Sequence, residues 1–501
     1  MSLIRKLLLA VSITMLLLVL GLVMASESSY LFSPAVSFSD IPEVNAEFIE
    51  TVIAGTKVSG AGLVDAEGIF PGYDGPSDLY YIPDADTAVS YTRGTDLYHH
   101  YDEAGGVHTL LAVKGETHSV YRFVETGLPV MDIRTIIENQ DRRRKRARVY
   151  VHDLENTSEE YMLEYNIRGG TSRAYPKKSY SLHNTLGLPM SMLGLPQNGK
   201  YVINSMYEDE YKVRDVLSWD IYSQFANALT DEATEPAMVY IEVFIDDVYQ
   251  GLYGLQEYNN EHKFGLTDRS GRIYEVDDYV FPGTESAAPS GGSWDGLSLK
   301  YNNLEYESRW DPMIEFVDLL QMADSEAFTA RADELLDIEN FLNYYLFVEV
   351  LQARDNVWKN MFFTHTPNGA IRVEPWDLDM TFASFLDQTD YTQNRVLVLL
   401  EHDYTFPLHQ LLRHYEGFGE AAAARYFELR GSILSDENLL NTYRGYHEQL
   451  RTTGALARDS QRWPEAPRIP AGRELFIEEF IVEHMAILDA HFTRLLGGGH
   501  G

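Results

Sequence analysis

The 501-residue sequence contains no cysteine. Disulfide frameworks, thiolate nucleophiles and metal sites with cysteine ligands are therefore excluded. An exported protein without cysteine has to hold its core without covalent cross-links, and a chain of this size can do so. The sequence is 45% hydrophobic and has 33 tyrosines, which is enough for one large domain or two.

Positive charge is also scarce, because 40 Lys and Arg residues face 76 Asp and Glu residues, giving a net charge of −36. The chain as a whole repels polyanions, so no nucleic acid and no anionic membrane surface is expected as a partner. A solvated acidic surface that keeps the protein soluble explains most of the excess. The exception is the basic run from Arg142 to Arg146, which either grips a phosphorylated or acidic partner or closes a helix favourably.

The sequence has only one long hydrophobic run. Arg5 and Lys6 precede an apolar stretch from Leu7 to Met24, and small polar residues follow. This pattern predicts that residues 1–25 are a signal peptide or an uncleaved N-terminal anchor. We therefore expect an exported protein, extracellular or on the cell surface, that meets a membrane only through this segment.

The rest of the chain is predicted to form two regions. Residues 26–120 contain short strand-like pieces and are expected to be a β-rich accessory region. Its neighbouring His99 and His100 should point apart on a strand, so a shared metal is not expected. Residues 121–496 form the second domain, with a mobile Gly/Ser/Pro/Ala linker at 281–305 and a disordered tail at 497–501. Amphipathic patterns predict helices at 208–228, 310–322, 324–336, 407–414, 420–435, 438–451 and 473–496.

The chain is organised around the stretch from Asp337 to Phe382. Apolar residues at three- and four-residue steps predict a buried helix with Asp337 as its N-cap. A polar loop with Asp355 and Asn360 follows, and then a hairpin with strands at 361–364 and 371–376.

Two acids, Asp377 and Asp379, leave the end of this hairpin. If the chain stays extended there, both point to the same side. Like charges about 4 Å apart repel by roughly 4 kcal/mol at an effective dielectric near 20, so a cation is needed to offset them. Carboxylates and an amide oxygen are the ligands that Mg²⁺ or Mn²⁺ prefers, although a surface hairpin with solvated acids has the same pattern.

A second informative stretch runs from Arg168 to Leu182. Its glycines permit close backbone approach, and Arg168 with a lysine could meet phosphate oxygens. Strand alternation puts Lys177 on the polar face with two serines, so Lys177 is preferred for phosphate binding and Lys178 is the second choice. An ordinary basic strand is the alternative interpretation.

The segment from Gly194 to Tyr201 nearly matches a phosphate-binding P-loop. A P-loop ends in Ser or Thr, whose hydroxyl binds magnesium, and Tyr201 cannot replace that residue. No hydrophobic strand precedes the glycine either, so a turn before a strand at 201–204 is expected instead.

The order of these motifs resembles the spore-coat protein H (CotH) kinase family. In this sequence Asp355 is followed five residues later by Asn360, then by an aromatic strand, and then by Pro-Trp-Asp-Leu-Asp. The resemblance covers about residues 128–496 and implies a highly diverged, atypical protein-kinase-like domain. It implies that Asp355 is the catalytic base, that Asn360 and Asp377 bind metal, and that Asp379 supports them.

The same resemblance extends to the basic stretch and to three further positions. Arg168 and Lys177 would hold phosphates, and Glu257, at the end of a Gly-x-Tyr-x-x-x-Glu strand, would orient Lys177. Arg214, in the helix expected at 208–228, would pair with carboxylates of the cleft, or with a surface acid. Glu275 departs from the family pattern, which has a lysine there.

The sequence thus predicts an α+β protein with a helical C-terminal part and a small β-rich region before the kinase-like domain. The implied reaction moves the γ-phosphate of ATP to a protein Ser or Thr hydroxyl, with Mg²⁺ or Mn²⁺ as cofactor. Two alternatives stay open: a catalytically silent secreted or surface-attached binding protein of the same fold, and a metal-dependent hydrolase that uses the same acids.

Overall fold

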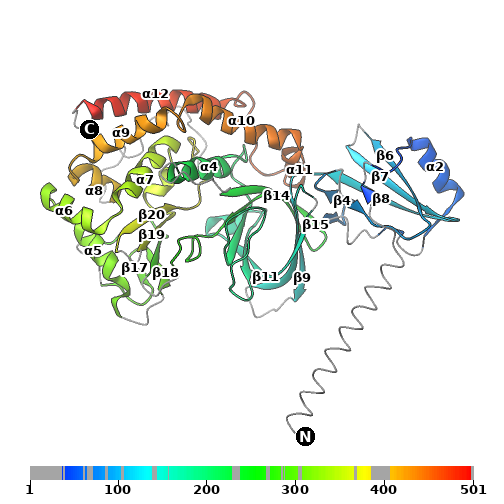
Figure 1. Ribbon diagram of the computed structural model, residues 1–501, viewed down its shortest axis with the longest axis horizontal. Coiled ribbons are helices and arrows are strands. Elements are labelled where there is room, and N and C mark those ends of the chain that lie inside the picture. Colours follow the sequence, from blue (N-terminus) through cyan, green and yellow to red (C-terminus); the bar gives the residue numbers. More distant parts are fainter. Residues whose placement is uncertain are drawn as a thin grey trace, which may run out of the picture. The chain divides into compact units, whose positions relative to one another are not determined.

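The computed structural model describes residues 36–37, 40–59, 63–64, 72–84, 88–102, 106–137, 144–155, 157–227, 237–266, 271–283, 286, 288–302, 307–365, 369–384 and 407–497. The predicted signal or anchor segment at 1–25 and residues 498–501 of the predicted tail lie outside these ranges. Within them, no helix has both the length and the apolar character required to cross a membrane. The described elements combine α-helices with several β-sheets, as the patterns in the sequence predict (Figure 1).

The chain divides into two compact units, each made of three segments. Unit 1 comprises Met1–Ile136, Ala147–Tyr161 and Ile241–Gly251, and unit 2 comprises Ile137–Arg146, Met162–Tyr240 and Leu252–Gly501. Every residue predicted for the functional site belongs to unit 2.

Unit 1 contains a sheet around a small core. Its strands, in spatial order, are β3 (Gly72–Asp74), β4 (Leu79–Ile82), β8 (Thr117–Glu125), β7 (Val107–Lys114) and β6 (Asp96–Asp102), and β2 (Lys57–Val58) pairs with β8. Ile82, Leu110 and Phe123 are buried in this core. The sequence did not predict α2 (Ala46–Gly55), which Asn45 caps by accepting a hydrogen bond from the Phe48 amide.

The two neighbouring histidines of β6 point to different partners, as predicted. The Nε2 atom of His99 lies 2.8 Å from Nδ1 of His108, and Nδ1 of His100 lies 3.0 Å from the carbonyl of Val44.

A closed barrel follows in the chain. Its strands are β9 (Val130–Ile137), β10 (Lys145–His152), β11 (Ser158–Arg168), β12 (Ser179–Asn184), β13 (Lys200–Asn204), β14 (Met238–Ile245) and β15 (Val248–Glu257), joined in the order β10-β11-β12-β13-β15-β14-β9. The pairing of β12 with β13 sets Ser181 opposite Val202 and His183 opposite Lys200. Because alternate residues share a face, Ser179, Ser181 and His183 lie on one side of β12.

Two expectations for this region can be compared with the structure. The basic run does not close a helix in its described part, because Lys145 begins strand β10; Arg142 and Arg143 lie outside the described residues. The near-P-loop segment leads into strand β13 rather than a helix, in agreement with its rejection as a P-loop.

Unit 2 contains a second sheet, which holds the hairpin of the central stretch. Its strands, in order, are β17 (Ser293–Trp294), β18 (Leu297–Asn302), β16 (Arg272–Val276), β19 (Met361–His365) and β20 (Ile371–Pro375). Two of these strands, β17 and β18, lie within residues 281–305, which were predicted as a mobile linker. Trp294 and Leu297 are buried, so apolar packing holds this segment despite its glycines and serines.

The buried helix predicted at the centre of the chain is α7 (Ile338–Leu351). The Asp337 side chain caps it by accepting a hydrogen bond from the amide of Asn340, as predicted. Tyr345 packs against Phe418 and Phe492. These two residues belong to α9 (Phe418–Arg430) and α12 (Phe476–Leu496), the helices that lie next to α7 (Figure 1). The helix therefore forms a fixed base for the polar loop that follows it.

Helix α4 (Arg214–Asn227) begins later than the predicted 208–228 segment. The Asp209 carboxylate accepts a hydrogen bond of 2.8 Å from the Arg214 amide, and Lys212 has a left-handed φ of 59°, so the helix cannot extend further back. The remaining helices are α5 (Asp311–Leu320), α6 (Ser325–Leu335), α8 (Pro407–His414), α10 (Asp436–Thr452) and α11 (Ala455–Arg462).

Candidate functional site

The loop after α7 brings Asp355 and Asn360 together. A left-handed Gln352, with φ of 52°, ends the helix, and a short 3₁₀ turn at Arg354–Val357 carries Asp355 into a buried position. The side-chain nitrogen Nδ2 of Asn360 donates a hydrogen bond of 2.7 Å to Oδ2 of Asp355. The side-chain oxygen of Asn360 is an acceptor that suits a further donor or a cation.

Two other side chains hold the Asp355 carboxylate. The Lys359 ammonium lies 3.3 Å from its Oδ2 atom, and the Tyr279 hydroxyl donates a hydrogen bond of 3.2 Å to Oδ1. Burial raises the pKa of Asp355, and Lys359 and Tyr279 oppose this increase. Asp377 contributes a further repulsion that raises the pKa, which shows that the two carboxylates lie within electrostatic reach of each other.

Asp377 and Asp379 do not lie in extended chain, so the alternation argument is wrong here. Asp377 has a φ of 60°, and the chain turns directly after β20. The turn is fixed at its start by Trp376, whose amide donates a hydrogen bond of 2.8 Å to the carbonyl of Asn360. The two acids nevertheless interact. Burial, and then repulsion from Asp377, holds the pKa of Asp379 well above its ordinary value.

Asp215, in the first turn of α4, is a further acid of this cluster that the sequence analysis missed. It is buried, its Oδ1 accepts a hydrogen bond of 3.3 Å from the Leu378 amide, and its Oδ2 accepts one of 2.5 Å from the Asn204 side chain. Burial and the neighbouring Asp377 raise the pKa of Asp215 to about 7. No local signal in the sequence indicated this contact, because Leu378 lies 163 residues further along the chain.

These residues form what we call the acidic cluster: Asp355, Asn360, Asp377, Asp379 and Asp215. Within the described ranges, no three or more His, Asp or Glu side chains are arranged as a metal site. The types of ligand atom still suit a hard divalent cation, because the cluster offers carboxylate and amide oxygens. A cation would also offset the repulsion between the carboxylates.

Arg214 is buried and pairs with carboxylates outside the acidic cluster. Its Nη1 atom lies 2.6 Å from Oδ1 of Asp209 and 2.9 Å from Oε2 of Glu210. An interaction of Arg214 with acidic side chains was predicted, but the observed partners, Asp209 and Glu210, lie just before helix α4. Arg214 therefore fixes the start of α4, and through it the position of Asp215.

The preferred phosphate-binding lysine is already ion-paired. Lys177 is fully buried, and its ammonium lies 2.6 Å from Oδ1 of Asp459 and 2.5 Å from the carbonyl of Leu252. Lys178 is partly exposed and donates to the carbonyls of Arg173 and Tyr175. Sequence analysis could not find the Asp459 partner, which is 282 residues further along the chain.

Glu257 and Lys177 are placed with different partners. The Asn198 side chain donates a hydrogen bond of 3.2 Å to Oε2 of Glu257, and the Lys263 ammonium lies 3.8 Å from Oε1. The expected ion pair between Glu257 and Lys177 thus gives way to Lys177 with Asp459. Glu275, the departure from the family pattern, pairs with Lys300 at 2.5 Å.

Arg168 lies next to the acidic motif. Its guanidinium carbon is 5.1 Å from the centre of the Trp376 ring, and Trp376 directly precedes Asp377. The following Gly169 has a φ of 105°, and a Cβ atom there would lie 1.9 Å from the Ser172 hydroxyl oxygen, so only glycine fits this close turn.

The family model described as CotH kinase protein matches residues 165–482, more than half of the chain. The chain belongs to the CotH kinase protein family. A search among curated proteins returned no significant match.

The CotH range contains every candidate site residue named above, from Arg168 to Asp379, and also Asp459. Family membership therefore covers both the acidic cluster and the buried Lys177 pair. It confirms the resemblance that the sequence motifs indicated.

Proposed function

We propose that this CotH family member is an atypical kinase that transfers the γ-phosphate of ATP to a Ser or Thr hydroxyl of a protein. The observation that carries the proposal is the acidic cluster, in which Asp355 is bonded to Asn360 and lies within electrostatic reach of Asp377. Phosphoryl transfer requires a carboxylate near the acceptor hydroxyl and oxygen ligands for a divalent cation. An atypical kinase-like fold of unit 2 is part of this proposal.

Asp355 is the candidate catalytic residue. Its raised pKa and its hydrogen bond from Tyr279 suit a carboxylate that orients an acceptor hydroxyl and takes up its proton. The Lys359 ammonium, 3.3 Å from Oδ2, favours the ionised carboxylate and so opposes the effect of burial on the pKa of Asp355.

Asn360 and Asp377, supported by Asp379, would hold Mg²⁺ or Mn²⁺. When bound, such a cation neutralises negative charge on the transferred phosphate. Asp215 keeps the turn in place by binding the Leu378 amide. Arg168, beside Trp376, is the candidate cation for the phosphates, whereas the Lys177 ammonium is already occupied by Asp459.

We also propose that the protein is exported, on the basis of the basic and apolar N-terminal segment. The buried Lys177–Asp459 pair favours one alternative, a silent binding protein of the same fold, because it removes a cation that the family resemblance assigns to the phosphates.

The test is incubation of purified protein with γ-labelled ATP, with and without Mg²⁺ or Mn²⁺, in the presence of candidate acceptor proteins. The kinase proposal predicts metal-dependent label on protein Ser or Thr. Label released only as free phosphate would support a hydrolase instead. No turnover and no nucleotide binding would support the silent protein.

A further inference from the structure

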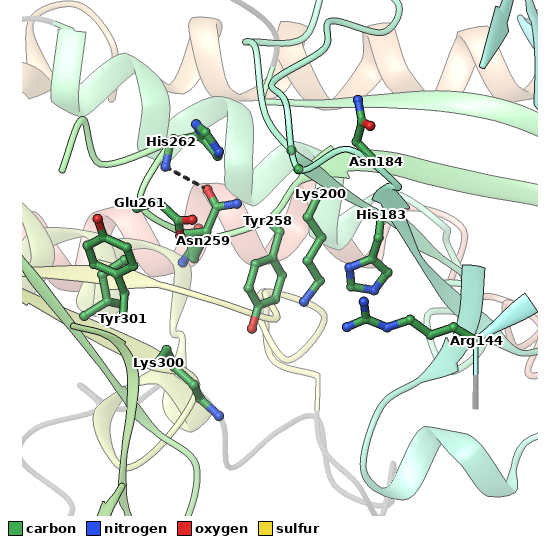
Figure 2. Close-up of a pocket in the computed structure, with 14 residues that line it drawn as sticks. Arg144, His183, Asn184, Lys200, Tyr258, Asn259, Glu261, His262, Lys300 and Tyr301 are labelled. Carbon is green, nitrogen blue, oxygen red and sulfur yellow. Dashed lines mark hydrogen bonds between the residues drawn. The ribbon is translucent and has the colours of Figure 1, made fainter. Parts of the chain in front are cut away.

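A cavity of about 380 Å³ in unit 2 collects positively charged side chains. Its wall comes from the residue before β10, the end of β12, the start of β13, the segment after β15 and strand β18. Figure 2 shows its charged and imidazole side chains, which are Arg144, His183, Lys200, Glu261, His262 and Lys300. In a chain with 76 acidic and 40 basic residues, three Lys and Arg side chains in one cavity indicate an anionic ligand.

Lys200 is the central cation of this cavity. Its ammonium lies 3.1 Å from the centre of the Tyr258 ring, and Figure 2 shows it between Tyr258 and His183. Burial, and then repulsion from Arg168, Arg144 and Lys300, lowers the pKa of Lys200 to about 7, while Glu275 acts in the opposite direction. An anion bound here would relieve this repulsion.

The neighbours of Lys200 differ in how much charge they can offer. The Lys300 ammonium already lies 2.5 Å from Glu275, whereas the Arg144 side chain is 51% exposed and lies 3.9 Å from Glu164. Burial and the nearby cations lower the pKa of His183 to about 3, so its neutral ring offers a hydrogen bond without charge. Lys200 and Arg144 are therefore the main cations available to a ligand.

The cavity is next to the acidic cluster. The Tyr258 ring, which lines the cavity, lies 5.2 Å from the Trp376 ring, and Trp376 directly precedes Asp377. Arg168 stacks on the same Trp376 and acts electrostatically on Lys200. Tyr258 and Trp376 thus link the cavity wall to the segment that carries Asp377, and Arg168 lies beside the same tryptophan.

We propose that this cavity binds the phosphate groups of the nucleotide, with Lys200 and Arg144 as its cationic contacts. The inference depends on the kinase function proposed above, and it names where the nucleotide binds. It also gives a role to the end of the near-P-loop segment, where Lys200 begins a strand instead of preceding a helix.

The test is the affinity of the purified full-length protein for ATP, pyrophosphate and adenosine, measured by calorimetry without divalent metal. Lys200→Met should weaken ATP and pyrophosphate binding about tenfold or more, because a charge-assisted contact is lost. Adenosine affinity should not change. Lys114→Met, which replaces an exposed lysine of β7 in unit 1, should leave all three affinities unchanged.

Arg144→Gln is the second variant, since this exposed side chain can be replaced without disturbing the core. It should weaken ATP binding severalfold. Unchanged ATP affinity in both variants would overturn the proposal, as would a loss of adenosine affinity equal to that for ATP, which would place the base in the cavity. Absence of ATP binding by the wild-type protein would also overturn it.

The binding site and the kinase function can fail separately. If Lys200→Met transfers phosphate with an unchanged KM for ATP, the proposed binding cavity is refuted and the kinase function stands. If Lys200→Met binds ATP more weakly but the wild-type protein transfers no phosphate, the binding cavity stands and the kinase function is refuted.

Discussion

Asp215 and Leu378 are joined by a hydrogen bond of 3.3 Å from the Leu378 amide to the Asp215 carboxylate. Leu378 lies between Asp377 and Asp379, so this bond ties the first turn of α4 to the turn that carries both acids. Hydrogen bonds to the backbone, as well as those between side chains, therefore fix the position of the acidic cluster.

We predict that Asp215→Ala lowers the rate of phosphate transfer about 10- to 100-fold, because Asp377 loses its fixed position. Asp215→Asn should retain more activity, since its amide oxygen can still accept from Leu378. Steady-state kinetics will show the effect mainly in kcat if Asp215 is a positioning residue. Equal losses in the two variants would contradict this role.

The buried pair of Lys177 and Asp459 should contribute to stability. Lys177→Met leaves the Asp459 carboxylate buried without its cation and should lower the free energy of unfolding by about 3–5 kcal/mol. Combining it with Asp459→Asn should restore part of the loss, because the asparagine oxygen can still accept from the Leu252 amide.

Urea denaturation measures these differences. Lys178→Met is the matched control, since this partly exposed lysine donates to the backbone carbonyls of Arg173 and Tyr175, and a loss of about 1 kcal/mol is expected. If Lys177→Met costs no more than Lys178→Met, the pair is not structural.

A divalent cation should stabilise the protein through the acidic cluster. Saturating Mg²⁺ or Mn²⁺ should raise Tm by about 2 °C or more, because the cation binds the folded carboxylates. Asp377→Asn should lose this shift, whereas Asp318→Asn, an exposed acid of α5, should keep it. An equal shift in both variants would place the metal elsewhere.

Nucleotide affinity should depend on pH through Lys200. The pKa of Lys200 is lowered to about 7, so the side chain is charged below that pH and neutral above it. ATP binding should therefore become tighter as the pH falls from 8 to 6, and the dependence should be smaller in Lys200→Met. The groups that face Lys200 are Arg168, Arg144, Lys300, Glu275, His183 and Tyr258.

Calorimetry at three pH values checks this expectation, with the wild-type and Lys200→Met proteins compared in the same buffers so that titration of the nucleotide itself cancels. Parallel pH profiles for the two proteins would show that Lys200 does not meet the anion.

Local patterns in the sequence predicted the elements of unit 2 well. Asp337 before an apolar stripe identified α7, and Pro407 to His414 were predicted with the observed bounds. Prediction from the sequence failed where contacts between residues far apart in the chain determine the local conformation. Asp377 leaves the extended conformation because the turn is held by Asp215 and Asn360, and neither bond leaves a local signal.

The same reason explains why the partner of Lys177 was not predicted. Alternation placed Lys177 on a polar face, but β12 begins only at Ser179, and the Lys177 ammonium turns to Asp459. The cavity around Lys200 combines segments between residues 144 and 301, so it becomes visible only in the folded chain.

The most direct test of the central claim is label transfer from γ-labelled ATP to protein by the wild type, Asp355→Asn and the control Asp318→Asn, at saturating ATP with Mg²⁺ or Mn²⁺. We predict that Asp355→Asn lowers the rate at least about 100-fold while ATP affinity is kept, because the acceptor hydroxyl loses its base. Transfer by Asp355→Asn at the wild-type rate would contradict the claim.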